Sequence, residues 1–196
     1  MKDRREYIIR KAMDLYALKG YQNVSITDLQ FALDMGRGTL YYYFKDQDEL
    51  FETCMEKYFF EPKQRALSNV PEDAGIEQMI VAIGCYFTSL EDALMTLDNK
   101  TINVSNFNDL MFTAHSKFPK LHRRAQRISL KELELWRNAI YHDQKVGLIR
   151  RDIDREQVAL MFTHIKNSYD AGLGNTQINF TLLRKTYSQL YKLLKI

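Results

Sequence analysis

Residues 25–44 read SITDLQFALDMGRGTLYYYF, and this stretch decides how the first part of the chain folds. Ser25 and Asp28 have the spacing of a capping box, in which a hydroxyl and a carboxylate each satisfy a backbone amide at the start of a helix. Residues 34–36 then break the helical pattern, because Asp and Gly tolerate the left-handed backbone at which helices end. A second short helix is predicted over residues 37–44. Two short helices joined by a tight turn form a helix-turn-helix.

Helices are also predicted on both sides of this stretch. Before it, apolar residues recur at steps of three and four positions and make one buried stripe that ends at Gly20. The stripe consists of Ile8, Ile9, Ala12, Met13 and Tyr16. After the stretch, Asp46 and Glu49 repeat the capping-box spacing, so a fourth helix is expected from there to Pro62 or beyond.

The rest of the chain is predicted to be helical as well. The clearest break lies at residues 71–75, while residues 91–105 have no clear pattern. Gly147 is expected to end the longest helix. With only 8 Gly and 3 Pro, the chain lacks the many tight turns of an all-β fold, so we predict an all-α protein. The further helices are expected over residues 77–90, 106–117 and 119–145, after a capping box at Asp154 and Gln157, and from Thr181.

The composition restricts the class of protein. With 45% hydrophobic and 12% aromatic residues the chain can build a core, which excludes intrinsic disorder. The 2 Cys and 4 His have neither disulfide nor metal-site spacing, so no metal and no cofactor are expected. The start of the chain lacks the apolar run of a secretion signal, and no stretch is long and apolar enough for a membrane span. We therefore expect a soluble, cytoplasmic protein with no membrane partner.

The short helix over residues 37–44 is unusual as a purely structural element. Gly38 lowers the stability of a helix, and three consecutive tyrosines cannot all face inward, because neighbours on a helix point about 100° apart. Leu40 and Phe44, four positions apart, are expected to form its buried side. A chance cluster on a solvated helix is one explanation. A DNA-reading helix explains both oddities, because Gly38 allows a close approach of the backbone and the tyrosine hydroxyls can hold phosphates; Arg37 is suited to guanine.

The order of these motifs resembles the DNA-binding domain of the tetracycline-repressor (TetR) family. The resemblance implies an all-α homodimer in which the first three helices, within residues 1–47, bind DNA. A fourth helix then leads into residues 48–196, implied to be a larger helical domain that binds an effector and dimerises, with about nine helices in the whole chain. The resemblance is carried by Gly20-Tyr21, Ser25, Asp28-Leu29, Gly38-Thr39-Leu40-Tyr41-Tyr42-Tyr43-Phe44 and Asp48-Glu49-Leu50-Phe51.

The residues expected to contact DNA follow from the helix face and from the resemblance. Two departures from the family pattern lie among them: Gly36 replaces a serine cap, and Gln47 replaces a common lysine. We therefore expect fewer phosphate contacts than the family usually makes. The set comprises Ser25, Thr27, Gly36, Arg37, Gly38, Thr39, Tyr41, Tyr42, Tyr43, Lys45 and Gln47.

The effector and dimer residues are less sharply specified. Aromatic, Met and His residues at helical spacing suit a mostly apolar cavity, although the same pattern is that of an ordinary core. The cavity candidates are Tyr86, Phe107, Met111, Phe112, His115, Trp136, Phe162 and His164. The resemblance places the dimer interface on the last two helices, through Met161, Ile165, Tyr169, Leu183, Tyr187, Leu190 and Tyr191.

We therefore predict a sequence-specific transcriptional regulator, a repressor that a small-molecule effector releases from double-stranded operator DNA. Two other functions stay open. One is a helical partner-binding protein in which the helix-turn-helix is vestigial. The other, an all-α enzyme, is disfavoured because the sequence has no Gly-rich phosphate loop, no nucleophile elbow and no metal-binding pair.

Overall fold

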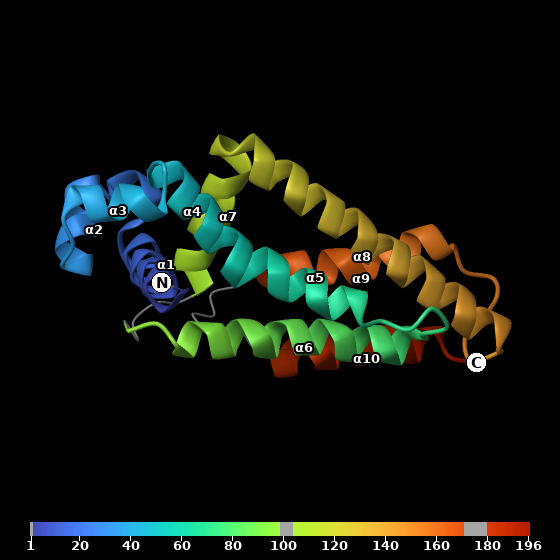
Figure 1. Cartoon of the computed structure of the whole chain (residues 1–196). Coiled ribbons are helices and arrows are strands. Elements are labelled where there is room, and N and C mark those ends of the chain that lie inside the picture. Colours follow the sequence, from blue (N-terminus) through green and yellow to red (C-terminus); the bar gives the residue numbers. More distant parts are fainter. Residues whose placement is uncertain (1, 99–103, 171–179) are drawn as a thin grey trace. The chain divides into compact units, whose positions relative to one another are not determined.

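The computed structural model describes residues 2–98, 104–170 and 180–196, and within these ranges the regular elements are helices (Figure 1). α4, η2 and α5 follow one another without a break, so the described residues form nine helical segments besides the short η1. The predicted all-α fold is confirmed. The elements are α1 (Lys2–Lys19), the 3-10 turn η1 (Tyr21–Asn23), α2 (Ile26–Leu33), α3 (Arg37–Tyr43), α4 (Gln47–Met55), the π-turn η2 (Glu56–Phe60), α5 (Glu61–Ser68), α6 (Ile76–Met95), α7 (Val104–Lys117), α8 (Pro119–Lys145), α9 (Arg155–Asp170) and α10 (Phe180–Leu194).

Local capping shapes the helix-turn-helix in the way that the sequence predicts. Ser25 Oγ accepts a hydrogen bond from the Asp28 amide (3.1 Å), and the Asp28 carboxylate accepts one from the Ser25 amide (2.9 Å). This completes the capping box of α2. Asp34 ends α2 in the left-handed conformation, with φ 49° and ψ 51°. Gly20 follows α1 at φ 76°, where a side chain would be strained.

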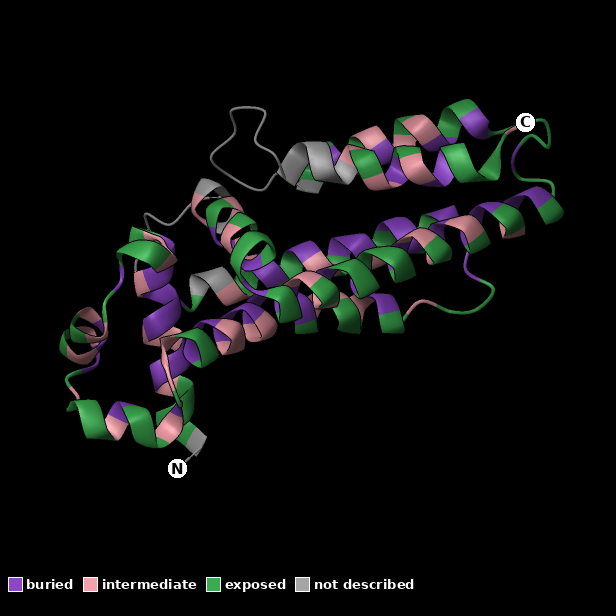
Figure 2. Ribbon diagram, turned by 90° about the horizontal axis from the view of Figure 1, so that it is seen from above, coloured by how far each residue is buried: buried purple, intermediate pink, exposed green. Residues whose placement is uncertain are grey.

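The chain forms two compact units, of which the first comprises Met1–Glu61 and Leu90–Ala125. In this unit α1 packs against α2, α4 and α7. The Phe51 ring lies 5.3 Å from that of Tyr16 and 4.9 Å from that of Phe118, measured between centroids. Buried residues of this kind follow the inner sides of the helices (Figure 2). These ring contacts join α1 and α4, which flank the helix-turn-helix in the sequence, to Phe118.

The start of α4 differs from the predicted capping box. Asp46 accepts a hydrogen bond from the Glu49 amide (2.8 Å), as expected. The Glu49 carboxylate, however, accepts from the Lys45 amide (2.7 Å) instead of reaching Asp46. The Glu49 side chain therefore caps the amide of Lys45, one residue before the Asp46 amide that the capping-box motif predicts.

The helix that begins with α4 continues past Pro62 to the end of α5. Proline cannot donate the hydrogen bond that an α-helix needs at this place. The π-turn η2 lies directly before it, and its wider bonds, such as that from the Glu61 amide to the Glu56 carbonyl, accommodate the missing donor. The sequence shows the proline but not this local widening of the helix.

The second unit comprises Pro62–Ser89 and Gln126–Ile196. Trp136 stacks on Phe162 with 4.5 Å between ring centroids and an angle of 11°, and Tyr187 contacts both rings. All three side chains are 0% exposed, so they form the core of this unit.

Polar contacts fix the loops of the second unit. Asp143, which is 2% exposed, accepts a hydrogen bond from the Ile76 amide (3.2 Å) at the start of α6. A Cβ at Gly75 would lie 2.2 Å from Asp143 Oδ1, so the loop before α6 has room only for glycine there.

Gly147 ends α8 at φ 77°, and Asp154 caps α9, both as predicted.

The segment without a clear sequence pattern is divided between two helices. α6 extends to Met95 and α7 begins at Val104, while residues 99–103 lie outside the described ranges. None of the helices described combines the length and the apolar character that crossing a bilayer requires. The predicted division between residues 1–47 and 48–196 separates DNA binding from effector binding and dimerisation, and does not describe how the helices pack. It stays a prediction.

Candidate nucleic-acid interface

α3 has one buried side and one exposed side. Leu40 and Phe44 are each 2% exposed, which confirms the buried pair predicted from their spacing. Tyr42 is 69% exposed and Tyr41 is 37% exposed. Arg37 lies at the exposed start of the helix. The outer face of α3 therefore presents a cation and aromatic side chains to solvent.

Aromatic rings restrain the side chains on this outer face. The Arg37 guanidinium lies over the ring of Tyr41, one turn further along, at 5.4 Å from the centroid. The rings of Tyr42 and Tyr43 meet edge to face at 5.1 Å. Thr39 and Tyr43 are half-buried beside them. Restrained side chains lose less conformational entropy when they bind a partner.

Gly36 and Gly38 have no role in the packing of the chain. A Cβ built at either position has no neighbouring heavy atom within 4 Å, and neither residue has a positive φ. Glycine destabilises a helix by about 1 kcal/mol relative to alanine. Gly36 is the N-cap of α3, where glycine is common, so only Gly38 is unexplained inside the protein. Together the two glycines leave the backbone at the start of α3 open to a close approach from outside.

Ser25 and Thr27 lie at the start of α2, where Thr27 is exposed. The Ser25 hydroxyl is hydrogen-bonded to the Asp28 carboxylate, and Lys19 Nζ forms an ion pair with the same carboxylate (2.8 Å). Lys19 and, after it, Ser25 hold the pKa of the Asp28 carboxyl well below its usual range. A phosphate contact at Ser25 would therefore share a hydroxyl that already serves the helix cap.

The start of α4 carries two predicted contacts with different surroundings. The Lys45 side chain is 85% exposed and lies 3.8 Å from Asp46, so its ammonium group is accessible to a partner. Gln47 turns inward, because its Nε2 donates a hydrogen bond to the Val24 carbonyl (2.7 Å). A phosphate contact by Gln47 would require that bond to break.

Sequence reasoning missed Arg5. Its guanidinium lies over the ring of Phe44, 4.9 Å from the centroid, and Phe44 is the residue that ends α3. Arg5 is exposed, so this contact presents a cation beside the end of α3. The only signal in the sequence is the run KDRR at residues 2–5, which does not indicate which of its cations reaches α3.

The predicted effector residues are divided between the two units: Met111, Phe112 and His115 lie in the first, and Tyr86, Trp136, Phe162 and His164 lie in the second. Phe112 is 74% exposed, whereas Trp136 and Phe162 belong to the aromatic core. The His115 ring meets that of His122 at 5.6 Å. The Phe107 side chain lies outside the described residues. Their role in a cavity stays a prediction.

The predicted dimer residues lie on α9 and α10. Three of them are buried within the protomer, two are half-buried, and one is exposed: Leu183, Tyr187 and Tyr191, then Ile165 and Leu190, then Met161. The Tyr169 side chain lies outside the described residues.

Cavities lie in both compact units. One, of about 510 Å³, lies in the first unit beside Glu6, Tyr7 and Lys57, and one of about 490 Å³ lies in the second unit beside Val81. Neither is lined by the predicted effector residues. The described side chains include no group of three or more His, Cys, Asp or Glu that could hold a metal ion.

Comparison with known proteins identifies the helix-turn-helix. Residues 8–54, which contain α2, α3 and most of α1 and α4, match the family described as "Bacterial regulatory proteins, tetR family". These residues form a DNA-binding domain of the TetR family. The chain is therefore a DNA-binding transcriptional regulator of the helix-turn-helix type.

The proteins similar to this chain are distant from it in sequence, and the solved structures among them share its fold. The "Uncharacterized HTH-type transcriptional regulator YerO" of Bacillus subtilis is 22% identical over 199 residues, which cover 91% of this chain and 68% of YerO. A tetR-family regulatory protein from Rhodococcus RHA1 is 15% identical with a TM-score of 0.71, over 98% of this chain and 97% of its own. A transcriptional regulator from Saccharomonospora viridis, solved in complex with choline, is 16% identical with a TM-score of 0.68, over 98% and 97%. These structures show that the similarity of fold extends over nearly the whole chain.

Proposed function

We propose that this TetR-family protein is a cytoplasmic repressor that binds double-stranded operator DNA as a homodimer and leaves it when a small-molecule effector binds. The observation that carries the proposal is the outer face of α3, where Tyr41 restrains Arg37 and Gly38 has no role inside the chain. Arginine is the commonest specific partner of guanine in the major groove. α3, the second helix of the helix-turn-helix, occupies the position of a recognition helix.

In this proposal the residues around α3 divide into two roles. Arg37 and Thr39 read base edges, and the backbone at Gly36 and Gly38 comes close to the DNA. Arg5 adds a phosphate contact beside the end of α3, which offsets the missing side chain at Gly36. The remaining residues position the protein on phosphates: Ser25, Thr27, Tyr41, Tyr42, Tyr43, Lys45 and, if its bond to Val24 opens, Gln47.

Residues 48–196 bind the effector and dimerise in this proposal. Met161 on α9 and Leu193 on α10 are 52% and 75% exposed, and exposed apolar side chains suit an interface between two copies. The choline complex of the Saccharomonospora regulator supports a small-molecule effector for a chain of this fold.

Release is then a shift of population. The dimer samples one spacing of its recognition helices that matches two successive major-groove half-sites and another that does not. An effector that binds the second state more tightly removes the repressor from DNA, and the shift is limited by the difference between its affinities for the two states.

The test is a binding titration of the purified full chain, by fluorescence anisotropy at low salt, on the promoter region beside its own gene. We expect binding that unlabelled promoter DNA displaces and that random DNA displaces poorly. Arg37→Ala should lose about 1–3 kcal/mol of the discrimination between the operator and a version with a mutated half-site. Arg123→Ala, at an exposed position of α8, is the matched control and should retain it. Absence of specific binding contradicts the proposal, and full discrimination by Arg37→Ala contradicts its base-reading role.

A further inference from the structure

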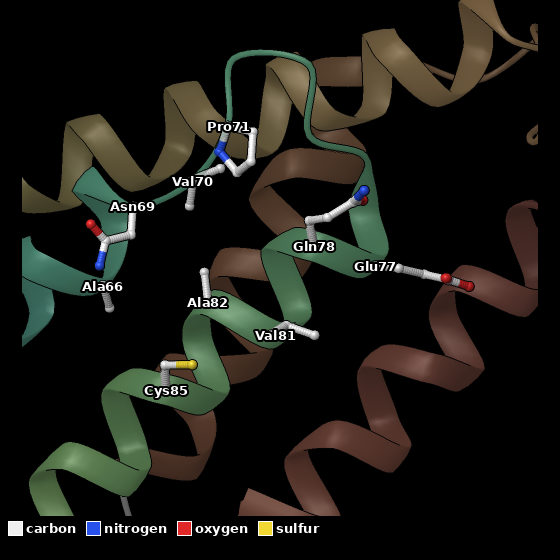
Figure 3. A pocket seen from close by; sticks show the side chains of 9 residues that line it. All are labelled: Ala66, Asn69, Val70, Pro71, Glu77, Gln78, Val81, Ala82 and Cys85. Atoms are coloured by element: carbon white, nitrogen blue, oxygen red, sulfur yellow. The ribbon is translucent and has the colours of Figure 1, made fainter.

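A cavity of about 490 Å³ lies between the end of α5, the loop over residues 69–75 and the outer side of α6 (Figure 3). All of its lining residues belong to the second unit. Its volume is within the range of about 300–1,000 Å³ that is typical of small-molecule sites. The cavity is thus large enough for a drug-sized molecule.

The loop that forms one wall is fixed without any ligand. The Gly75 amide donates a hydrogen bond to Gln78 Oε1 (3.0 Å), and the Ile76 amide donates one to the buried Asp143 carboxylate (3.2 Å). Pro71, at the other end of the loop, has a restricted φ. A ligand that binds against this preformed loop therefore requires little further ordering of the protein.

The lining indicates the chemistry of the ligand. Four of the lining residues, Ala66, Val70, Val81 and Ala82, are aliphatic, and Val81 is 60% exposed. In Figure 3 the amide side chains of Asn69 and Gln78 lie at the edges of this aliphatic surface.

Hydrogen bonding and charge further restrict the class of ligand that fits the cavity. Gln78 Oε1 already accepts a hydrogen bond from Gly75, so the Gln78 amide offers its N–H groups to a ligand. The lining contains no Lys or Arg, and its one charged residue is Glu77. Glu77 is itself paired with Lys195 Nζ (3.7 Å), so a ligand of either charge would lose water without gaining a free counter-charge.

We propose that this cavity binds an uncharged, mainly apolar small molecule with a hydrogen-bond acceptor such as a ketone or ester carbonyl, and that filling the cavity weakens operator binding. The proposed binding depends on the cavity alone. The proposed effect on operator binding rests on the proposed function, because it makes this cavity an effector site.

Cys85 provides a direct reporter of occupancy. It lines the cavity and is exposed, whereas the second of the 2 cysteines of the chain, Cys54, is 0% exposed and its pKa is raised by burial. A water-soluble thiol reagent should therefore modify Cys85 alone in the folded protein. The rate of modification then measures how accessible the cavity is.

Two probes of equal size test the ligand class on the full chain. 2-Acetylnaphthalene, which is neutral and carries a ketone, should slow the modification of Cys85 by about tenfold at ten times its dissociation constant. 2-Naphthoate, its anionic counterpart, should leave the rate unchanged. Protection by neither probe, or equal protection by both, would overturn the proposed binding site.

A second experiment tests the effect on DNA binding. Cys85 is modified with benzyl methanethiosulfonate or, as the small counterpart, with methyl methanethiosulfonate. The benzyl adduct should bind the operator about tenfold more weakly than the methyl adduct, a difference of about 1.4 kcal/mol, and a thiol reductant should restore binding. Equal affinities would overturn the regulatory half and leave the result of the probe experiment standing. If the unmodified protein does not bind the operator, the failure is that of the proposed function. If the benzyl adduct alone turns the dimer into a monomer, a second copy covers the cavity and the small-molecule site is wrong.

Discussion

Replacing Gly38 with alanine should raise the stability of the protein and lower its affinity for DNA. Gly38 is the second residue of α3, a helix of 7 residues. A Cβ there meets no heavy atom within 4 Å and requires no change of φ, so the substitution introduces neither a clash nor strain. Alanine is favoured over glycine by about 1 kcal/mol inside a helix, and by somewhat less in the first turn. We therefore expect the free energy of unfolding to rise by about 0.5–1 kcal/mol.

The effect on DNA binding should have the opposite sign. If the backbone at Gly38 approaches the operator closely, the added methyl group occupies that space and pushes α3 away from its contacts. A loss of about tenfold in affinity, or ~1.4 kcal/mol, is the least that such a displacement should cause. No part of the protein itself accounts for such a loss, because the substitution leaves the internal packing unchanged.

Thermal unfolding and fluorescence anisotropy on the operator measure the two effects in the same preparation. The midpoint of unfolding should rise by about 2–4 °C per kcal/mol for a chain of this size. Gly147→Ala is the matched control: Gly147 has φ +77°, so alanine should destabilise the protein by about 1–2 kcal/mol and leave operator affinity unchanged. A Gly38→Ala protein that binds the operator as tightly as the parent would refute the close approach. A Gly38→Ala protein that unfolds more easily would refute the description of α3.

Three further substitutions test other parts of the structure. Arg5→Gln should weaken binding to all DNA sequences alike and reduce the slope of log affinity against log salt by about 0.9; an unchanged slope would exclude Arg5 from phosphate contact. Gly75→Ala should lower the free energy of unfolding by about 2 kcal/mol, because its Cβ would lie 2.2 Å from Asp143 Oδ1, and a urea titration with no change would contradict the tight fit. Burial and, after it, the neighbouring His122 hold the pKa of His115 below its ordinary value of 6.5, so the unfolded chain binds this proton more readily than the folded protein. Stability should therefore be highest above that value and fall as the pH decreases through it; His115→Gln should show a smaller fall between pH ~7.5 and ~5.5, and identical falls would rule out this linkage.

The features predicted correctly from the sequence are those set by neighbouring residues. The Ser25–Asp28 capping box, the left-handed Asp34 and the end of α8 at Gly147 each depend on a few adjacent positions. The spacing of Leu40 and Phe44 likewise fixes which side of α3 is buried, because a helix returns to the same side after four residues.

The features that the sequence did not reveal depend on distant residues or on small ones. Gln47 bonds to Val24, 23 positions earlier, and Arg5 contacts Phe44, although no local pattern links either pair. Trp136, one of the aromatic residues predicted for a cavity, stacks on Phe162 at 0% exposure, a contact between positions 26 residues apart that no local pattern reveals; its role in a cavity stays a prediction. The cavity beside α6 is lined mainly by small side chains, which have no distinctive sequence pattern.

Because the Gln47 amide holds the Val24 carbonyl, affinity and stability are not independent at this position. A lysine there would supply a phosphate anchor, yet it would leave a part-buried carbonyl without its donor, at a cost of up to about 1–3 kcal/mol. Such a change succeeds only where the protein is stable enough to bear the loss, or where another donor for Val24 has appeared first. Position 47 and the position of a replacement donor for Val24 are therefore epistatic. The order in which substitutions arise at these two positions decides whether a descendant of this protein can acquire tighter binding to its operator.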